Sequence, residues 1–113
     1  MLREEDVVRL RHMLDAARKA IGFVMNRQRT DLDTDDLLVF GIVRAIEVIG
    51  EAARQVTPEG QALCPSIPWA SMIAMRNRIV HAYFDINLDR VWETVTDDLP
   101  ALIPQLERIL ASV

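Results

Sequence analysis

The sequence is poor in cysteine and has no long apolar run. Its one cysteine, Cys64, excludes an internal disulfide framework and a cysteine-based structural zinc site. No uninterrupted apolar stretch approaches the ~20 residues that a membrane-spanning helix needs, and the N-terminal residues lack the layout of a signal peptide. We therefore expect a cytoplasmic protein. Residues 1–113, half of them hydrophobic, are expected to fold as one domain.

Lysine is nearly absent, because Lys19 is the single lysine among thirteen basic residues and the rest are arginine. The formal net charge of −4 argues against a general nucleic-acid binder, which would show a basic excess. Arginine favours planar, bidentate contacts to carboxylate or phosphate, although genome composition would explain the same bias. Any binding of an anionic partner would therefore have to come from a local patch of arginines.

The spacing of apolar residues predicts an all-α bundle of four to five helices. The predicted helices cover residues 2–28, about 35–56, Pro68 to about 82, and about 88–112. Residues 57–68 hold three prolines and a glycine and are expected to form a loop. Pro100 lacks a backbone donor, so we expect a kink there, or two abutting helices. No stretch shows the sustained period-2 alternation of a strand.

The second predicted helix carries a stripe of charged residues on an otherwise apolar surface. Its members, at spacings of 3, 4 and 3, are Arg44, Glu47, Glu51 and Arg54. The stripe is interpreted either as a solvated face with ion pairs along the helix or as the lining of a polar cleft or subunit interface. Small residues such as Gly50 would let another helix approach this one closely.

The third predicted helix places one arginine on an otherwise apolar stripe. At spacings of 4, 3, 4 and 3 the stripe holds Trp69, Ile73, Arg76, Val80 and Tyr83. A guanidinium on a core-facing stripe needs an anion or a wet cleft, because it does not deprotonate. Arg76 would either form a structural ion pair with Glu47 or Glu51, or face a cleft and bind phosphate.

Polar residues crowd the end of the same helix. On a continuous helix Asn77 would share a face with His81, and Arg78 and Tyr83 would lie nearby. A histidine is the usual general acid or base in proteins, although one near a helix end is often structural. Composition and spacing alone do not name a reaction for this cluster.

Other candidate sites are weaker. His12 is expected on the surface, and Cys64 has no nearby histidine to activate it as a nucleophile. The acidic segment 31–36 lacks the glycine and closing glutamate of a calcium loop and is better explained as a set of helix caps. We therefore expect neither a metal site nor a cofactor.

The segment Arg76-Asn-Arg-Ile-Val-His-Ala-Tyr83 resembles the signature of the HEPN superfamily, and within it the HepT-like (DUF86) toxins. That signature is an arginine followed by a polar residue, then a histidine after four residues and a tyrosine two positions later. Further likeness lies in Ala45–Ala53, in Ile67-Pro-Trp69, and in the segments Phe84–Asn87, Val91-Trp92 and Asp98–Pro100. The resemblance covers nearly the whole chain, with no departure at the signature positions.

The resemblance implies an α-helical homodimer in which two motif helices face each other across a composite cleft. It implies a metal-independent ribonuclease, the toxin of a toxin–antitoxin pair. Arg76 and His81 would be catalytic, and Asn77, Arg78 and Tyr83 would support substrate binding. The charged stripe of the second helix, with Arg44, Glu47 and Glu51, would line the cleft. The partner would be a minimal nucleotidyltransferase (MNT) antitoxin that attaches AMP to Tyr83.

Two other functions remain open at this point. The chain could be a non-catalytic helical binding subunit of a nucleotidyltransferase, which would keep the same motif residues. It could also be a plain helical dimer in which Arg76 forms a structural ion pair. The sequence separates these alternatives poorly, because all three retain Arg76.

Overall fold

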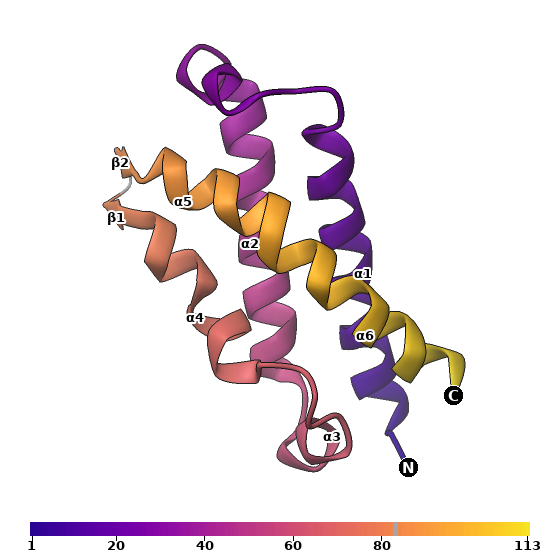
Figure 1. Cartoon of the computed structure of the whole chain (residues 1–113). Helices are drawn as coiled ribbons and strands as arrows, with labels where there is room; N and C mark the ends of the chain where they lie inside the picture. The colour runs from indigo at the N-terminus through magenta and orange to yellow at the C-terminus, as the bar shows by residue number, and fades with distance from the viewer. Residues whose placement is uncertain (83) are drawn as a thin grey trace.

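The computed structural model describes residues 1–82 and 84–113 as a mostly helical domain (Figure 1). Tyr83 lies outside the described residues. The helices are α1 (Glu4–Phe23), α2 (Asp36–Gln55), α3 (Pro58–Leu63), α4 (Trp69–Ile79), α5 (Leu88–Glu93) and α6 (Leu99–Ala111). A 3-10 turn covers Arg29–Asp33, and a π-helical segment, Thr94–Asp98, joins α5 to α6. Counting α5 to α6 as one continuous run gives five helices in the described chain, within the predicted range.

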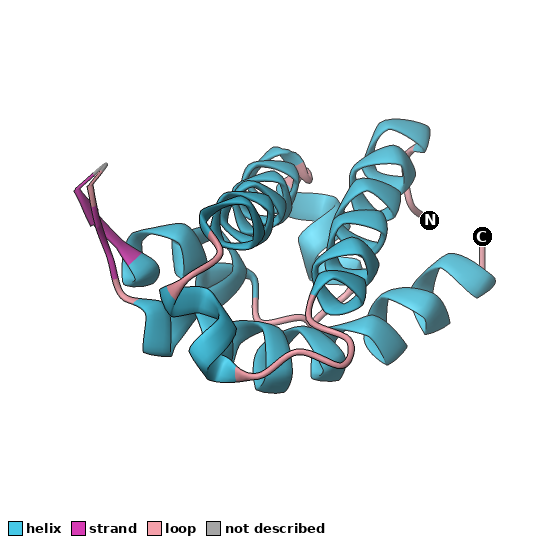
Figure 2. Ribbon diagram, turned by 90° about the horizontal axis from the view of Figure 1, so that it is seen from above, coloured by secondary structure: helices cyan, strands magenta, loops and turns pink. Residues whose placement is uncertain are grey.

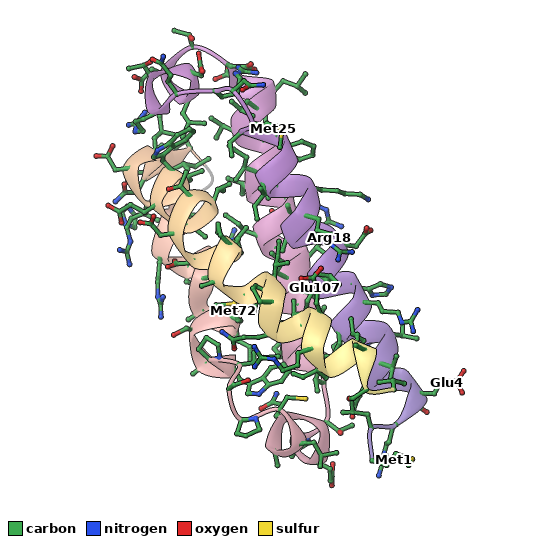
Figure 3. All side chains as sticks on the ribbon, turned by 45° about the vertical axis from the view of Figure 1, so that its right-hand side comes forward. Met1, Glu4, Arg18, Met25, Met72 and Glu107 are labelled. Carbon is green, nitrogen blue, oxygen red and sulfur yellow. The ribbon has the colours of Figure 1, made fainter. Side chains whose placement is uncertain are left out.

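Helices α1 and α2 form an antiparallel pair, and the run from α5 to α6 crosses them obliquely (Figure 1). Helix α4 packs against α2 on the side away from α1, and α3 lies at the end of the molecule near the N-terminus. The side chains of Arg18 and Glu107 meet at 2.6 Å between α1 and α6 (Figure 3). In the described part of the chain, no helix is long and apolar enough to cross a membrane.

The core confirms the apolar pattern of the two long helices. Fully buried side chains from α1, α2 and α6 meet in one cluster, among them Leu10, Met13, Ile42, Ile46 and Leu106. Gly50 of α2 lies against α4, because a Cβ at this position would be 3.2 Å from the carbonyl oxygen of Met72. The close helix approach expected at Gly50 is therefore confirmed.

The apolar surface of α2 is not covered on every side. Leu37 and Phe40 project from α2 with 82% and 65% of their surface exposed. Large apolar side chains on one helix face, flanked by charged ones, are typical of a surface that meets another molecule.

The sequence predicted a loop over residues 57–68, but the first half of this segment is helical. Helix α3 begins at Pro58, a position where the missing N–H has no cost. The hydroxyl of Thr57 caps the helix by accepting from the N–H of Gly60. Thr57 also donates through its own N–H and hydroxyl to the buried carboxylate of Asp6, at 2.9 and 2.6 Å. This contact to α1, which spacing cannot reveal, fixes the start of α3.

Two further features also differ from the predictions, the end of α1 and the place of the distortion near Pro100. Helix α1 ends at Phe23 rather than 28, and Asn26 in the turn after it adopts a left-handed backbone with φ 61°. The distortion expected at Pro100 lies just before it, in the π-helical segment, because a proline ring clashes with the preceding turn.

The third predicted helix ends at Ile79 instead of about residue 82. The chain then forms a two-stranded antiparallel hairpin of β1 (Val80–Ala82) and β2 (Asp85–Ile86), at the edge of the helical body (Figure 2). The N–H of Asn87 donates to the carbonyl of Ile79 at 2.7 Å and closes the base of the hairpin. The fold is therefore mostly helical rather than purely all-α.

Candidate active site at the end of helix α4

Arg76 lies in the last turn of α4, and its side chain is exposed. The expectation that it points toward the core is wrong. On an ideal helix Arg76 lies at the flank of the buried stripe formed by Met72, Met75 and Ile79, where a long side chain reaches solvent. Its guanidinium donates a long hydrogen bond of 3.5 Å to the side-chain oxygen of Asn77.

The structural ion pair considered for Arg76 does not form among the described residues. Glu51 instead accepts hydrogen bonds from Gln55 and Arg54, which together hold the pKa of its carboxyl below the usual range. Glu47 is half-buried and forms no ion pair within the described chain. The positive charge of Arg76 is therefore not neutralised by an acidic side chain in the described structure.

His81 lies on strand β1 and not on the motif helix. It occupies the irregular position of the hairpin, between the pairs Val80↔Ile86 and Ala82↔Asp85. The helical face that Asn77 and His81 were expected to share is therefore absent. A bulge of this kind turns a side chain out of the regular ladder and is common next to active sites. The side chain of His81 is 57% exposed.

Among the described residues, Asp85 lies beside His81, and the sequence did not single it out. Its Oδ2 lies 3.5 Å from Nδ1 of His81, across the hairpin. The signal in the sequence was an acidic residue four positions after the histidine, and it could be recognised only once the chain was known to turn between them.

Arg78 points to a different side of α4 from Arg76, since residues two apart on a helix are about 200° apart. Its guanidinium donates to the hydroxyl of Ser71 at 3.3 Å. Arg78 and Ser71 line a groove of about 220 Å³ together with Asp97 and Asp98. The acidic neighbours make this groove a less suitable place for an anionic ligand than the Arg76 side.

The charged stripe of α2 lies on the outside of the molecule. Arg44 is exposed and forms no ion pair among the described residues. It lines a groove of about 250 Å³ between α1 and α2 with His12, Lys19 and Phe23. Arg54 is paired with Glu51 at 2.6 Å. Of the two α2 arginines, Arg44 is therefore the one available to an anionic ligand.

The structure gives no support to a nucleophilic Cys64 or to a metal site among the described residues. Burial, followed by the charge of Asp6, raises the pKa of the Cys64 thiol, which makes it a poor nucleophile at neutral pH. Within residues 1–82 and 84–113, no three His, Cys, Asp or Glu side chains are grouped so that they could hold a metal ion. Tyr83, the proposed modification site, falls outside the described residues.

These features define a mostly helical domain with an exposed Arg-x4-His motif where a helix passes into a hairpin. The chain belongs to the HepT-like family: the family described as "Ribonuclease HepT-like" matches residues 13–109.

Proteins that are similar to this chain over most of its length are named as ribonucleases. A Thermococcus cleftensis protein named "Probable ribonuclease HepT" is 37% identical over 79 residues, which cover 70% of this chain and 72% of the relative. A Caldanaerobacter subterraneus subsp. tengcongensis protein named "Putative RNase" is 32% identical over 101 residues, covering 89% and 90%. No solved structure gives a significant match.

Proposed function

We propose that this chain is a metal-independent ribonuclease whose catalytic groups are Arg76 and His81. The observation that carries the proposal is the exposed guanidinium of Arg76, which has no acidic partner in the described chain and lies five residues before an exposed histidine. Membership of a family named for ribonucleases supports the same activity.

The residue types suit RNA cleavage by the 2′-hydroxyl of the substrate. That hydroxyl attacks the adjacent phosphorus, a proton leaves it, and a proton is supplied to the departing 5′-oxygen. His81 would act as general acid or base, which contributes about 10²–10⁴ in rate. Arg76 would bind the phosphate and stabilise the negative charge that grows on it. Asn77, in contact with Arg76, would orient the guanidinium or a phosphate oxygen.

We also propose that two copies of the chain form the complete site. In one chain Arg76, Asn77 and His81 all lie on an exposed surface, whereas electrostatic catalysis works best where water is excluded. Leu37 and Phe40 offer apolar area for a second copy on the exposed face of α2 that also carries Arg44. A homodimer would enclose the two motifs in one cleft.

The biological role proposed here is that of a toxin restrained by an MNT nucleotidyltransferase antitoxin. Support comes from the resemblance of the motif, which includes Tyr83 as the residue that would accept AMP. An AMP group beside Arg76 and His81 would block the cleft and repel RNA through its negative charge. Because the net charge is −4, RNA affinity would depend on the local arginines Arg76 and Arg44 and would fall with salt.

RNA cleavage in EDTA tests the activity, using purified wild type beside Arg76→Ala and His81→Ala. An intact-mass spectrum first establishes that Tyr83 is unmodified. Cleavage by the wild type, lost in both folded variants, is the expected result. If unmodified wild type cuts no RNA pool, the proposal fails, and a non-catalytic binding subunit of a nucleotidyltransferase becomes the better account.

A further inference from the structure

We infer that Asp85 is a positioning residue, which holds the imidazole of His81 through Nδ1 and leaves Nε2 directed at the substrate. The inference rests on the proposed ribonuclease function, because it assigns a second residue to the same site. The basis is the placement of the two side chains on the hairpin, with Asp85 Oδ2 3.5 Å from His81 Nδ1.

The hairpin fixes this placement from both ends. Val80 is buried at the start of β1, and its pairing with Ile86 sets the register of the two strands. The bond from the N–H of Asn87 to Ile79 closes the base, and the side chain of Asn87 caps α5 by accepting from the N–H of Arg90. The backbone on either side of His81 and Asp85 is thus held by the core and by α5.

The irregular register at His81 explains why the two side chains meet. In a regular antiparallel pair, neighbours on one strand point to opposite faces. Ala82 is paired with Asp85, and the extra residue between the pairs of this hairpin is His81. The bulge therefore lets the imidazole lean toward the carboxylate of Asp85 instead of following the ladder.

Neither side chain has a competing polar partner in the part of the chain that the structure describes. The other acidic residues near the hairpin are engaged elsewhere: Asp89 binds Arg29 at 2.7 Å, and Glu93 binds Arg90 at 3.2 Å. Asp85 is thus the carboxylate left for His81. The distance of 3.5 Å exceeds an ideal hydrogen bond, as is common for catalytic contacts before substrate binds.

A neutral imidazole can carry its proton on either nitrogen, and the partner of one nitrogen decides the state of the other. A carboxylate at Nδ1 favours the tautomer with the proton on Nδ1. Nε2 then keeps its lone pair and can accept the proton of the substrate 2′-hydroxyl. Without Asp85 the ring would rotate freely and change tautomer, so fewer encounters would be productive.

The test compares Asp85→Asn with Glu93→Gln, since each exchanges one exposed carboxylate near the hairpin for an amide. In steady-state cleavage of an RNA oligonucleotide, Asp85→Asn should lower kcat about 10- to 100-fold and leave KM nearly unchanged. This is the loss seen when a metal-binding histidine loses the carboxylate that orients its ring. Glu93→Gln should match the wild type, and Asp85→Glu should recover most of the activity. A kcat for Asp85→Asn equal to that of Glu93→Gln would overturn the inference.

A second measurement needs no substrate. Two-bond ¹H–¹⁵N spectra report which imidazole nitrogen is protonated, and they would be recorded at about pH 9, above the ordinary pKa range of histidine. A His12→Gln variant, which leaves one histidine in the sequence, assigns the signals of His81. We expect the Nδ1–H tautomer in the wild type and the Nε2–H tautomer in Asp85→Ala. The same tautomer in both proteins would contradict the pairing. Failure of the wild type to cleave RNA would instead defeat the proposed function, with the spectra still reporting the contact.

Discussion

Arg76 combines an exposed side chain with a charge that no acidic residue of the described chain pairs, and this combination favours a functional role over a structural one. Removing a side chain from a buried ion pair would cost about 3–5 kcal/mol of unfolding free energy. Arg76 has no acidic partner among the described residues. Its loss should therefore affect the reaction and leave the fold nearly unchanged.

Arg76→Ala should keep the free energy of unfolding within about 0.5 kcal/mol of the wild type, as expected for an exposed position. RNA cleavage should fall about 10²–10³-fold, the scale for losing one group that stabilises transition-state charge. Urea unfolding and cleavage rates measured on the same preparations check both parts. A large loss of stability would instead favour the structural ion pair.

The residues of the candidate site could be identified from the sequence, but their geometry could not. The Arg-x4-His spacing singled out Arg76 and His81, and the exposure of both agrees with a functional role. Asp85 escaped notice because its proximity to His81 depends on a turn. Val80 continues the apolar spacing of α4, so the spacing alone predicts a longer helix. The helix ends at Ile79 because Val80 pairs with Ile86 in the hairpin, and apolar spacing along the sequence does not reveal such a pairing.

At the scale of elements, α1 and α2 were predictable because their apolar residues repeat strongly over twenty residues each. Helix α3 was missed because its stability depends on the contact of Thr57 with Asp6, 51 residues away. A helix of only six residues within a proline-rich stretch has no propensity signal strong enough to reveal it.

The packing of α4 on α2 depends on the absence of a side chain at Gly50. A larger residue would press on the carbonyl oxygens of Met72 and Ile73, which lie 3.2 and 3.4 Å from the position of a Cβ. Gly50→Val should therefore lower the free energy of unfolding by about 1–3 kcal/mol. Gly22→Ala is the matched control, because no atom lies within 4 Å of its Cβ position.

Gly22→Ala should stabilise α1 by up to about 1 kcal/mol through helix propensity. Denaturant unfolding of the two variants beside the wild type measures both effects. Equal stability of Gly50→Val and wild type would show that α4 is free to move away from α2, which would contradict the close packing described here.

The loop between α1 and α2 should make stability depend on acid pH. A hydrogen bond from Arg27, at 2.7 Å, and one from the N–H of Leu38 lower the pKa of Asp35. A carboxyl whose pKa is lower in the folded state stabilises the fold above its unfolded pKa of about 3.9. That contribution disappears as the pH falls through the lowered pKa of the folded protein.

Asp35→Asn keeps a helix-capping side chain but removes the charge. Its stability deficit relative to the wild type should be full at neutral pH and should shrink below about pH 3.9. Urea unfolding of both proteins across this range measures the difference. A deficit that stays constant with pH would mean that the charge of Asp35 contributes nothing.

At the scale of the whole molecule, the proposed homodimer explains why α2 exposes large apolar side chains. Phe40 is 65% exposed on the same face as Arg44. Phe40→Glu should convert the dimer to a monomer and abolish cleavage without unfolding the chain, because burying a charge at an interface is costly. Leu63→Glu, on α3 and 51% exposed, is the matched control and should stay dimeric and active.

Light scattering during size-exclusion chromatography checks this prediction, with the wild type expected at twice the chain mass of 12.9 kDa. A wild type that is monomeric at all concentrations and still cleaves RNA would show that one chain holds the complete site. A Phe40→Glu protein that remains dimeric would place the interface on another face.

If Arg76 and His81 cleave RNA through its own 2′-hydroxyl, as we propose, the cleavage products must carry characteristic ends. Unmodified wild type would be incubated in EDTA with an RNA oligonucleotide and with the same oligonucleotide 2′-O-methylated throughout. We expect cleavage of the first alone, leaving a 2′,3′-cyclic phosphate and a free 5′-hydroxyl. Cleavage of the methylated strand, 5′-phosphate ends, or activity that appears only when a divalent metal is added would contradict it.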